Sequence, residues 1–349
     1  MIYTAIDQVQ QGDYLGRNIY ASDGRILLHE GVQLTIGLLS KLRHMGVHAI
    51  YLKDDRFNDI EVEEVISEKT KRKAITTLSE SYQYVQNGHQ QLNGKAITTT
   101  IKSIIDEIFE NQDLLITLTD IRTEDNELFV HSVNVCIMSV IIGLKVGLDR
   151  TKLQELAIGA LLHDIGKVID NDSTAKGNDG QGDLNDHTWK GFNLLRKNKE
   201  ISTLSAHIAL THHEHVDGSG SPRQLGDKDI HVLSKIVAVT NHYDNLISSE
   251  TGARRLHPYE ACEEIMGLTN IRFSHPVVWR FLRAVAFYPT GSQVKLSTGE
   301  TGVVVGQHTG LPQRPIVRTY KIHGSADDYE IKELDLAKAT TVFITEVVT

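Results

Sequence analysis

Apolar residues recur every three or four positions through most of the stretch 97–288, which is the period of an amphipathic helix. Thr151 and Gln154 predict a capping box at the start of one such helix, and Gly166 predicts its stop. The apolar stripe between them comprises Leu153, Leu156, Ala157, Ala160 and Leu161. Beyond it, a run rich in Asn, Asp and Gly over 170–183 predicts a mobile loop. The central stretch is therefore predicted to be an all-helical domain.

The first 55 residues show shorter and more varied patterns. Two β-prone runs, 17–20 and 25–28, flank a turn signal. A helix is predicted over 35–45, and a strand over 49–52 closes the unit. The charged and polar stretch 56–96 then predicts a helical connector with a solvated face, whose apolar spacing is too irregular for a coiled coil.

Past Pro289 the pattern changes to short β-prone runs separated by Gly-rich turns. The predicted strands lie at 293–296, 302–305 and 316–320. We therefore predict a mainly α protein with a small unit at each end. Its four parts are a small α+β N-terminal domain (1–55), a helical connector (56–96), a helical domain (97–288) and a small β C-terminal domain (289–349).

The composition narrows the class of protein. The 349 residues carry 36 Lys and Arg against 45 Asp and Glu, a formal net charge of −9. This balance argues against binding to nucleic acid polymers or anionic membranes, although bound metal ions can make one pocket positive enough for a phosphate. Cys136 and Cys262 are too few for a disulfide framework or a structural zinc site. The N-terminus lacks the regions of a signal peptide, and the most apolar segment, 133–144, is too short to span a bilayer. We expect a cytoplasmic protein.

His163 and Asp164 stand together at the end of the apolar stripe. A helix end can present an imidazole and a carboxylate to one centre, and a carboxylate has two oxygens with which to bridge two metal ions. Alone, such a pair is more often a polar pair at a helix terminus. Followed by Lys167 and by later histidines, it predicts a multinuclear metal site that hydrolyses a phosphate ester.

Glu127 and His131 are four residues apart on a predicted helix, so they share one face and could supply two further ligands. An ordinary surface pair is an equally good interpretation of that spacing. His187, taken alone, would be interpreted as a satisfied core histidine.

His212 and His213 follow an apolar helix, where neighbouring histidines can reach different ions of a cluster. The alternative is a pair of ordinary interfacial histidines. We favour ligands because a turn from Asp217 to Gly220 follows, and its glycines let the backbone approach a ligand closely.

Taken together, these pieces make the segment 127–246 resemble the HD-GYP family of cyclic di-GMP phosphodiesterases. The flanking segments also resemble regions seen beside this domain. The matching pieces are Glu127-x-x-x-His131-Ser132, Leu161-Leu-His-Asp-Ile-Gly-Lys167, His187-x-x-x-Gly191, His212-His-Glu-x-x-Asp-Gly-x-Gly220 and Ile236-Val-Ala-Val-Thr-Asn-His-Tyr-Asp-Asn-Leu246.

The resemblance implies an all-helical HD-type phosphohydrolase core with two or three divalent ions, commonly iron or manganese. These ions would activate the attacking water and stabilise charge on the attacking and leaving oxygens. Asp164 would bridge two ions, and Lys167 would neutralise a phosphate oxygen. The product would be linear pGpG or, with three ions, GMP. The implied ligands are Glu127, His131, His163, Asp164, His187, His212, His213 and the position of Asn241. The implied substrate contacts are Lys167, Asp217, Gly220, Ser221, Pro222, Arg254 and Arg255.

Two departures from the family pattern bear on activity. Asn241 stands where the family has a ligand Asp, and a neutral amide binds hard or borderline cations less tightly than a carboxylate. Asp244, three residues on, is expected to play a supporting role. Ser221 replaces the Tyr of the Gly-Tyr-Pro motif, so no aromatic surface is offered there to a base.

Three functions follow from these features. The first is an active cyclic di-GMP phosphodiesterase in bacterial signalling, which the retained His and Asp residues favour. The second is a degenerate domain that binds a cyclic dinucleotide or a signalling protein without turnover, which Asn241 and Ser221 favour. The third is a phosphohydrolase acting on another nucleotide. A homodimer through the connector is compatible with all three.

Overall fold

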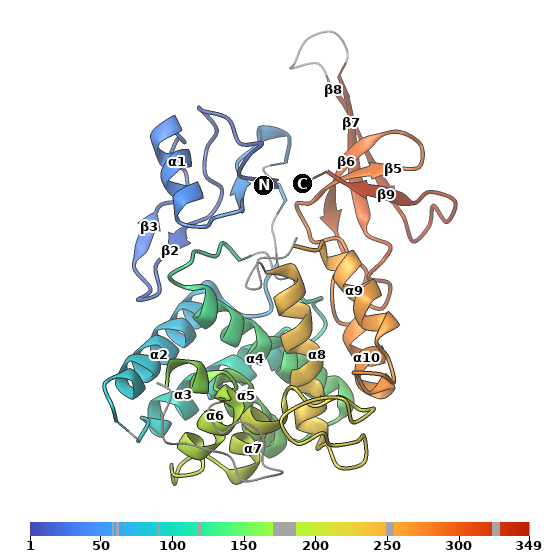
Figure 1. Cartoon of the computed structure of the whole chain (residues 1–349). Coiled ribbons are helices and arrows are strands. Elements are labelled where there is room, and N and C mark those ends of the chain that lie inside the picture. Colours follow the sequence, from blue (N-terminus) through green and yellow to red (C-terminus); the bar gives the residue numbers. More distant parts are fainter. Residues whose placement is uncertain are drawn as a thin grey trace.

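The computed structural model describes residues 1–57, 59–60, 63–89, 91–117, 120–169, 186–248, 255–322 and 329–348. A helical body carries two smaller units, and these lie side by side at one end of it with both chain termini between them (Figure 1). The N–H of Tyr3 donates to the carbonyl oxygen of Gly291 at 3.0 Å, which joins the two small units directly. The predicted loop 170–183 lies outside the described residues. The domain limits given above stay predictions.

The N-terminal unit has the predicted α+β composition. Strand β2 (Ile19–Tyr20) pairs antiparallel with β3 (Ile26–Leu28), and helix α1 (Ile36–His44) begins after Thr35, whose hydroxyl accepts from the Leu38 N–H. Strand β4 (Ala49–Leu52) pairs antiparallel with β1 (Ile2–Ala5), a strand that the sequence patterns did not predict. The helix and the strands at 17–20, 25–28 and 49–52 are thus confirmed.

The body consists of helices that pack around one central helix, α4 (Glu127–Val146). They are α2 (Glu68–Gln86), α3 (Gly94–Glu110), α4, α5 (Arg150–Leu161), α6 (His187–Leu195), α7 (Thr203–Thr211), α8 (Val232–Ile247), α9 (Pro258–Gly267) and α10 (His275–Leu282), with 3-10 turns η1 (Asp55–Phe57) and η2 (Ile165–Val168). Helix α4 contacts α2, α3, α5, α8 and α10. The mainly α fold class is confirmed.

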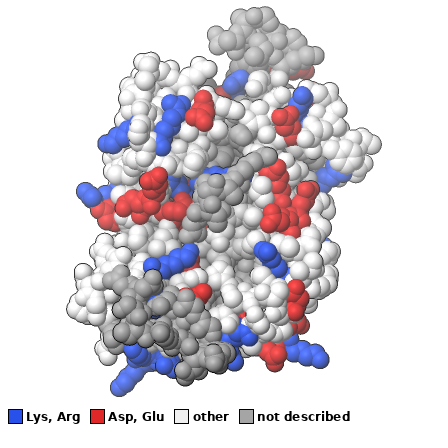
Figure 2. All heavy atoms as spheres, viewed as in Figure 1, with Lys and Arg blue, Asp and Glu red and all other residues white. Residues whose placement is uncertain are grey.

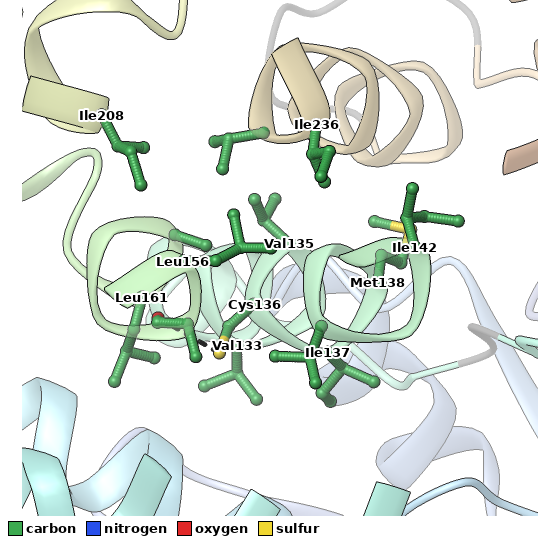
Figure 3. Close-up of a cluster of buried hydrophobic side chains, with 14 of the residues drawn as sticks. Val133, Val135, Cys136, Ile137, Met138, Ile142, Leu156, Leu161, Ile208 and Ile236 are labelled. Atoms are coloured by element: carbon green, nitrogen blue, oxygen red, sulfur yellow. Dashed lines mark hydrogen bonds between the residues drawn. The ribbon is translucent and has the colours of Figure 1, made fainter. Parts of the chain in front are cut away.

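Helix α4 is apolar on almost every side because it is enclosed by its neighbours. Figure 3 shows its side chains, among them Val135 and Met138, within a layer completed by Leu156 of α5, Ile208 of α7 and Ile236 of α8. The helix is long and apolar enough to cross a bilayer by length and composition, but 78% of that window is buried inside the molecule. It is therefore a core helix of the body.

Two sequence predictions about α5 are wrong. Its N-cap is Asp149, whose carboxylate accepts from the Lys152 N–H at 2.9 Å, so Thr151 and Gln154 already lie inside the helix. A capping carboxylate two residues upstream competes better for the free N–H groups. The helix also ends before Gly166, which lies in η2 and does not terminate α5.

The C-terminal unit is a five-stranded antiparallel sheet in the order β8-β7-β6-β5-β9. Strands β5 (Gln293–Leu296), β6 (Thr301–Gly306) and β7 (Ile316–Ile322) confirm the three predicted runs. The sequence patterns missed β8 (Tyr329–Asp335) and β9 (Ile344–Val347). Most described residues of β8 are exposed, so this edge strand has no apolar alternation to detect.

Candidate metal centre

Asp164 is buried between the end of α5 and the start of η2, and each of its carboxylate oxygens faces two imidazoles. Oδ2 lies 3.3 Å from Nε2 of His163 and 3.7 Å from Nε2 of His131. Oδ1 lies 3.4 Å from Nε2 of His187 and 3.6 Å from Nε2 of His212. Four sequence segments that are far apart along the chain therefore meet at one carboxylate, which has one pair of histidines on each side.

These side chains form two groups in which one ligand atom from each residue lies within 4.8 Å of the others. The first group is His131, His163 and Asp164, and the second is His187, His212 and His213. In the second group, Nε2 of His213 lies 3.2 Å from Nε2 of His187. Asp164 touches both groups, so the arrangement is that of two adjacent ion sites with a shared carboxylate.

The imidazole rings are oriented by hydrogen bonds at the opposite nitrogen. Nδ1 of His163 donates to the carbonyl oxygen of Ala160 at 2.8 Å, and Nδ1 of His212 donates to that of Ala209 at 2.9 Å. Nδ1 of His131 donates to Oδ2 of Asp244 at 2.7 Å. In each ring the Nε2 lone pair is thereby left facing Asp164, which is the arrangement in which imidazole binds a metal ion.

The charge states also suit a cation. Burial would raise the pKa of the Asp164 carboxyl, but His163, Lys167 and His212 outweigh it and hold that pKa well below its ordinary value. Burial lowers the pKa of His212 well below its ordinary value and lowers the pKa of His213 to about 4. Near neutral pH the centre thus offers an ionised carboxylate at Asp164 and neutral imidazoles at His212 and His213.

One buried atom in the centre has no partner. Nε2 of His212 is inaccessible to solvent and makes no hydrogen bond with any described residue. Leaving a buried acceptor unsatisfied is costly, so this atom indicates that something else binds there. The donor set of imidazole nitrogens and one shared carboxylate fits divalent metal ions.

Close backbone contact places His187 in the centre. A Cβ atom on Gly166 would lie 1.8 Å from the His187 carbonyl oxygen and 2.8 Å from the Gly191 nitrogen, so η2 and α6 approach each other only because residue 166 has no side chain. A Cβ atom on Gly191 would meet its nearest neighbour at 3.4 Å. Gly166, more than Gly191, therefore permits this close packing.

Glu127 does not belong to either group. Its carboxylate accepts from Arg122 Nη1 at 3.0 Å, and Nη2 of the same guanidinium donates to Asp244 Oδ1 at 2.6 Å. Asp244 is fully buried, and Asn134 also donates to it at 3.4 Å. Asp244 thus supports His131, as expected, whereas sequence reasoning missed Arg122 because a lone arginine in a loop carries no spacing signal. The role of Glu127 as a ligand stays a prediction.

Replacing Asp244 with Asn should weaken the centre without dismantling it. An amide keeps the shape of the carboxylate but removes the charge that holds His131 Nδ1–H, and losing such an outer partner typically costs about 10–100-fold in metal affinity. We expect an Asp244→Asn protein to bind Mn²⁺ about 10-fold to 100-fold more weakly in an equilibrium titration. Asp229→Asn, at an exposed position, should leave the affinity unchanged. Equal affinities in the two variants would contradict the supporting role.

Asn241 is buried on α8, one turn before Asp244. Its Oδ1 accepts from Nδ2 of Asn245 at 3.4 Å. Helix α8 is anchored to α4 on both sides of this position, since Thr240 bonds with Ser139 at 2.9 Å and Asp244 bonds with His131. The position is thus held beside the centre, but its side chain is neutral.

Five of the seven predicted substrate contacts lie on two segments, η2 and the turn after α7. Lys167 extends from η2 and pairs with Asp164 Oδ2 at 2.7 Å. Asp217 and Ser221 are exposed on the turn after α7. A Cβ atom on Gly220 would lie 2.2 Å from the His215 nitrogen, so this turn requires glycine. The cis bond between Ser221 and Pro222 completes it.

Glu214 holds that turn in place through hydrogen bonds. Its buried carboxylate accepts from the N–H groups of Arg223 at 2.7 Å and Leu225 at 2.8 Å. Sequence reasoning did not assign it this role. Of the two predicted basic contacts, Arg254 lies outside the described residues, and Arg255 lines a separate cavity with Tyr3 and His48.

Comparison with known proteins agrees with this geometry. Residues 103–272 match the model of the HD domain family, and residues 293–349 match a KOW domain associated with HD domain. The chain is 30% identical over 256 residues to the cyclic di-GMP phosphodiesterase PA4108 of Pseudomonas aeruginosa, covering 70% of this chain and 62% of the relative. It is 35% identical over 184 residues to a cyclic di-GMP phosphodiesterase of Thermotoga maritima, covering 51% of this chain and 50% of the relative.

The chain therefore spans between half and 62% of the length of these two curated relatives. Among solved structures, Bd1817, a HDG"Y"P protein from Bdellovibrio bacteriovorus, aligns with a TM-score of 0.48 at 19% identity, covering 80% of this chain and 98% of that one. The HD domain match contains Asp164 and the five histidines gathered around it. The chain thus carries an HD domain over residues 103–272 and is similar to curated cyclic di-GMP phosphodiesterases.

Proposed function

We propose that this protein is a phosphodiesterase that hydrolyses cyclic di-GMP at a centre of two divalent ions. The observation that carries the proposal is the carboxylate of Asp164, whose two oxygens each face a separate set of Nε2 atoms. Two curated relatives bear the name of this activity, which supports the choice of substrate. The closed helical body and the acidic surface favour a small phosphodiester over a nucleic acid polymer.

The residues of the centre would hold two ions between them. His131 and His163 would hold one ion, His187, His212 and His213 the other, and Asp164 both. Such ions lower the pKa of water and stabilise charge on the attacking and leaving oxygens of a phosphodiester. Lys167, whose ammonium lies 2.7 Å from Asp164, would turn toward a phosphate oxygen when cations neutralise that carboxylate.

The number of ions follows from the two positions at the edge of the centre. Glu127 is paired with Arg122, and Asn241 carries no charge. Neither position therefore offers a third ion the free carboxylate that it needs. We propose two ions, iron or manganese, with linear pGpG as the product, and a cytoplasmic location in keeping with the two buried free cysteines.

The test is hydrolysis of cyclic di-GMP by the purified protein supplied with Mn²⁺ or, without oxygen, Fe²⁺. Chromatography should show pGpG accumulating, with no turnover after chelation. A parallel assay with a mixed cyclic dinucleotide, 3′3′-cGAMP, would reveal a different substrate choice. If metal-loaded protein turned over neither substrate, the proposal would be wrong.

A second function is favoured by Asn241 and Ser221. The first lacks the charge of a carboxylate ligand, and the second is exposed and offers no ring for a base to stack on. In that case the domain would bind a cyclic dinucleotide as a receptor. Tight binding of cyclic di-GMP by metal-loaded protein without any product over hours would favour this function.

Replacing Asn241 with Asp separates the two functions. A buried carboxylate beside the centre should raise its affinity for divalent ions about tenfold, the lower limit of the effects typical for groups around a metal. Asn87→Asp, which adds the same charge at an exposed position at the end of α2, serves as the control. We expect the Mn²⁺ concentration needed for half-maximal turnover to fall in Asn241→Asp alone. Turnover that appears only in Asn241→Asp would instead identify the natural protein as a receptor.

A further inference from the structure

A second cavity lies away from the metal centre, where the three parts of the chain meet. Its volume is about 350 Å³, and it is lined by residues of β1 and β4, of the segment between α8 and α9, and of the C-terminal sheet. The polar and aromatic lining residues that matter here are Tyr3, His48, Arg255, His257, Phe287 and Tyr288. None of the predicted metal ligands lines this cavity.

The cavity has an unusual charge for so acidic a chain. Among its described lining residues there is no Asp or Glu, whereas Arg255 and two histidines are present. The face drawn in Figure 2, by contrast, carries acidic side chains in groups on both sides of its middle. A cavity with fixed positive charge and no carboxylate attracts anions.

One N–H group of the Arg255 guanidinium has no hydrogen-bond acceptor among the described residues. This group is the Nε–H, whose nitrogen is buried. Burial lowers the pKa of the guanidinium, and nearby Tyr3 and Glu127 only partly oppose this effect. A buried guanidinium with an unsatisfied N–H is costly unless an anion completes it, and its planar fork suits a phosphate.

Aromatic rings form one wall of the same cavity. His257 stacks on Tyr259 with ring centroids 5.9 Å apart and planes at 7°, and Tyr259 stacks on Tyr288 at 5.5 Å and 26°. Tyr3 contributes a ring from the N-terminal unit, tilted against Tyr51 at 5.1 Å. Stacked rings are held rigidly, so they present flat surfaces at little cost in side-chain freedom.

We propose that this cavity binds a small phosphorylated molecule with a flat ring, of the mononucleotide class. Arg255 would hold the phosphate, and the rings of Tyr3 and Tyr288 would contact the base. The volume lies near the lower end for small-molecule sites, which favours one nucleotide over a dinucleotide.

Such a ligand would bridge the three parts of the chain that line the cavity. The Tyr3 N–H bonds with Gly291 at 3.0 Å, and Gln8 reaches the Val348 carbonyl at 3.4 Å. The Leu256 N–H donates to Leu246 at 2.9 Å and ties the cavity to the end of α8, the helix of Asn241 and Asp244. Occupancy should therefore raise the thermal unfolding midpoint of the whole chain.

The test is calorimetric titration of the full chain with AMP, adenosine and inorganic phosphate. AMP should bind at least tenfold more tightly than either fragment, because only AMP engages the arginine and the rings together. Arg255→Leu should weaken AMP binding at least tenfold, and Arg255→Lys by less. Arg283→Leu, an exposed arginine stacked over Trp279, is the matched control and should bind AMP normally. Circular dichroism would establish that each variant is folded.

A variant of the metal centre distinguishes this site from that centre. Asp164→Asn protein should bind AMP as tightly as the natural chain, so the result stands whether or not the chain hydrolyses cyclic di-GMP. Loss of AMP binding in Asp164→Asn would place the nucleotide at the metal centre and overturn the proposal. Unchanged affinity in folded Arg255→Leu, or no AMP binding at all, would overturn it equally.

Discussion

Asp164→Ala should abolish the hydrolysis of cyclic di-GMP while leaving the helical body folded. The carboxylate lies within 3.7 Å of four imidazole nitrogens, so its loss removes the one group that both ion sites share. Outer partners of metal ligands already account for about 10–100-fold. Removing the shared inner ligand should therefore lower turnover at least about a hundredfold and reduce the metal bound per chain.

The measurement is turnover at saturating Mn²⁺ together with the metal content after desalting. Asp229→Ala changes an exposed aspartate outside the centre and should behave as the natural protein does. Because Asp164 also neutralises Lys167, circular dichroism is needed to show that the fold survives. Full metal content with normal turnover in Asp164→Ala would show that the two groups of histidines do not depend on this carboxylate.

Position along the chain made His163, Asp164, His212 and His213 candidate ligands, whereas His187 became a candidate only through the resemblance to the HD-GYP family. His163 and Asp164 end an apolar stripe, and His212 and His213 end another. Periodicity locates helix ends, and helix ends are where polar side chains can converge. The way in which Asp164 divides the imidazoles between its two oxygens depends on the packing of four segments, and no local pattern contains that information.

Two residues that the sequence analysis did not place correctly are also brought to their partners by tertiary structure. Arg122 bonds with Asp244, which lies 122 residues further along the chain, and Arg255 and Tyr3 line a cavity that three units form together. Both contacts are set by tertiary structure. The edge strand β8 was missed for a different reason, since its exposed residues give no alternation between apolar and polar positions. Sequence patterns thus identified the elements with one buried face and the residues at their ends.

Gly166→Ala should disrupt the centre almost as severely as loss of a ligand, through a single methyl group. The added Cβ would lie 1.8 Å from the His187 carbonyl oxygen and 2.7 Å from its carbon, and a backbone atom cannot turn aside as a flexible side chain can. Helix α6 must therefore move away from η2, and it carries His187 out of reach of Asp164. Overpacking of this kind typically costs about 1–3 kcal/mol of stability. We expect a lower unfolding midpoint and at least about a hundredfold lower turnover.

Gly191→Ala is the control that isolates the steric cause. Residue 191 lies on the same interface, but an added Cβ would meet its nearest atoms at 3.4–3.6 Å, an ordinary contact distance. Alanine is also favoured over glycine by about 1 kcal/mol within a helix, so Gly191→Ala should be as stable as the natural chain or more so. Differential scanning calorimetry and metal content would compare the two variants. If both lost His187 from the centre equally, the approach of η2 to α6 would depend on small residues at both positions; if neither did, α6 would have room to shift while the centre stayed intact.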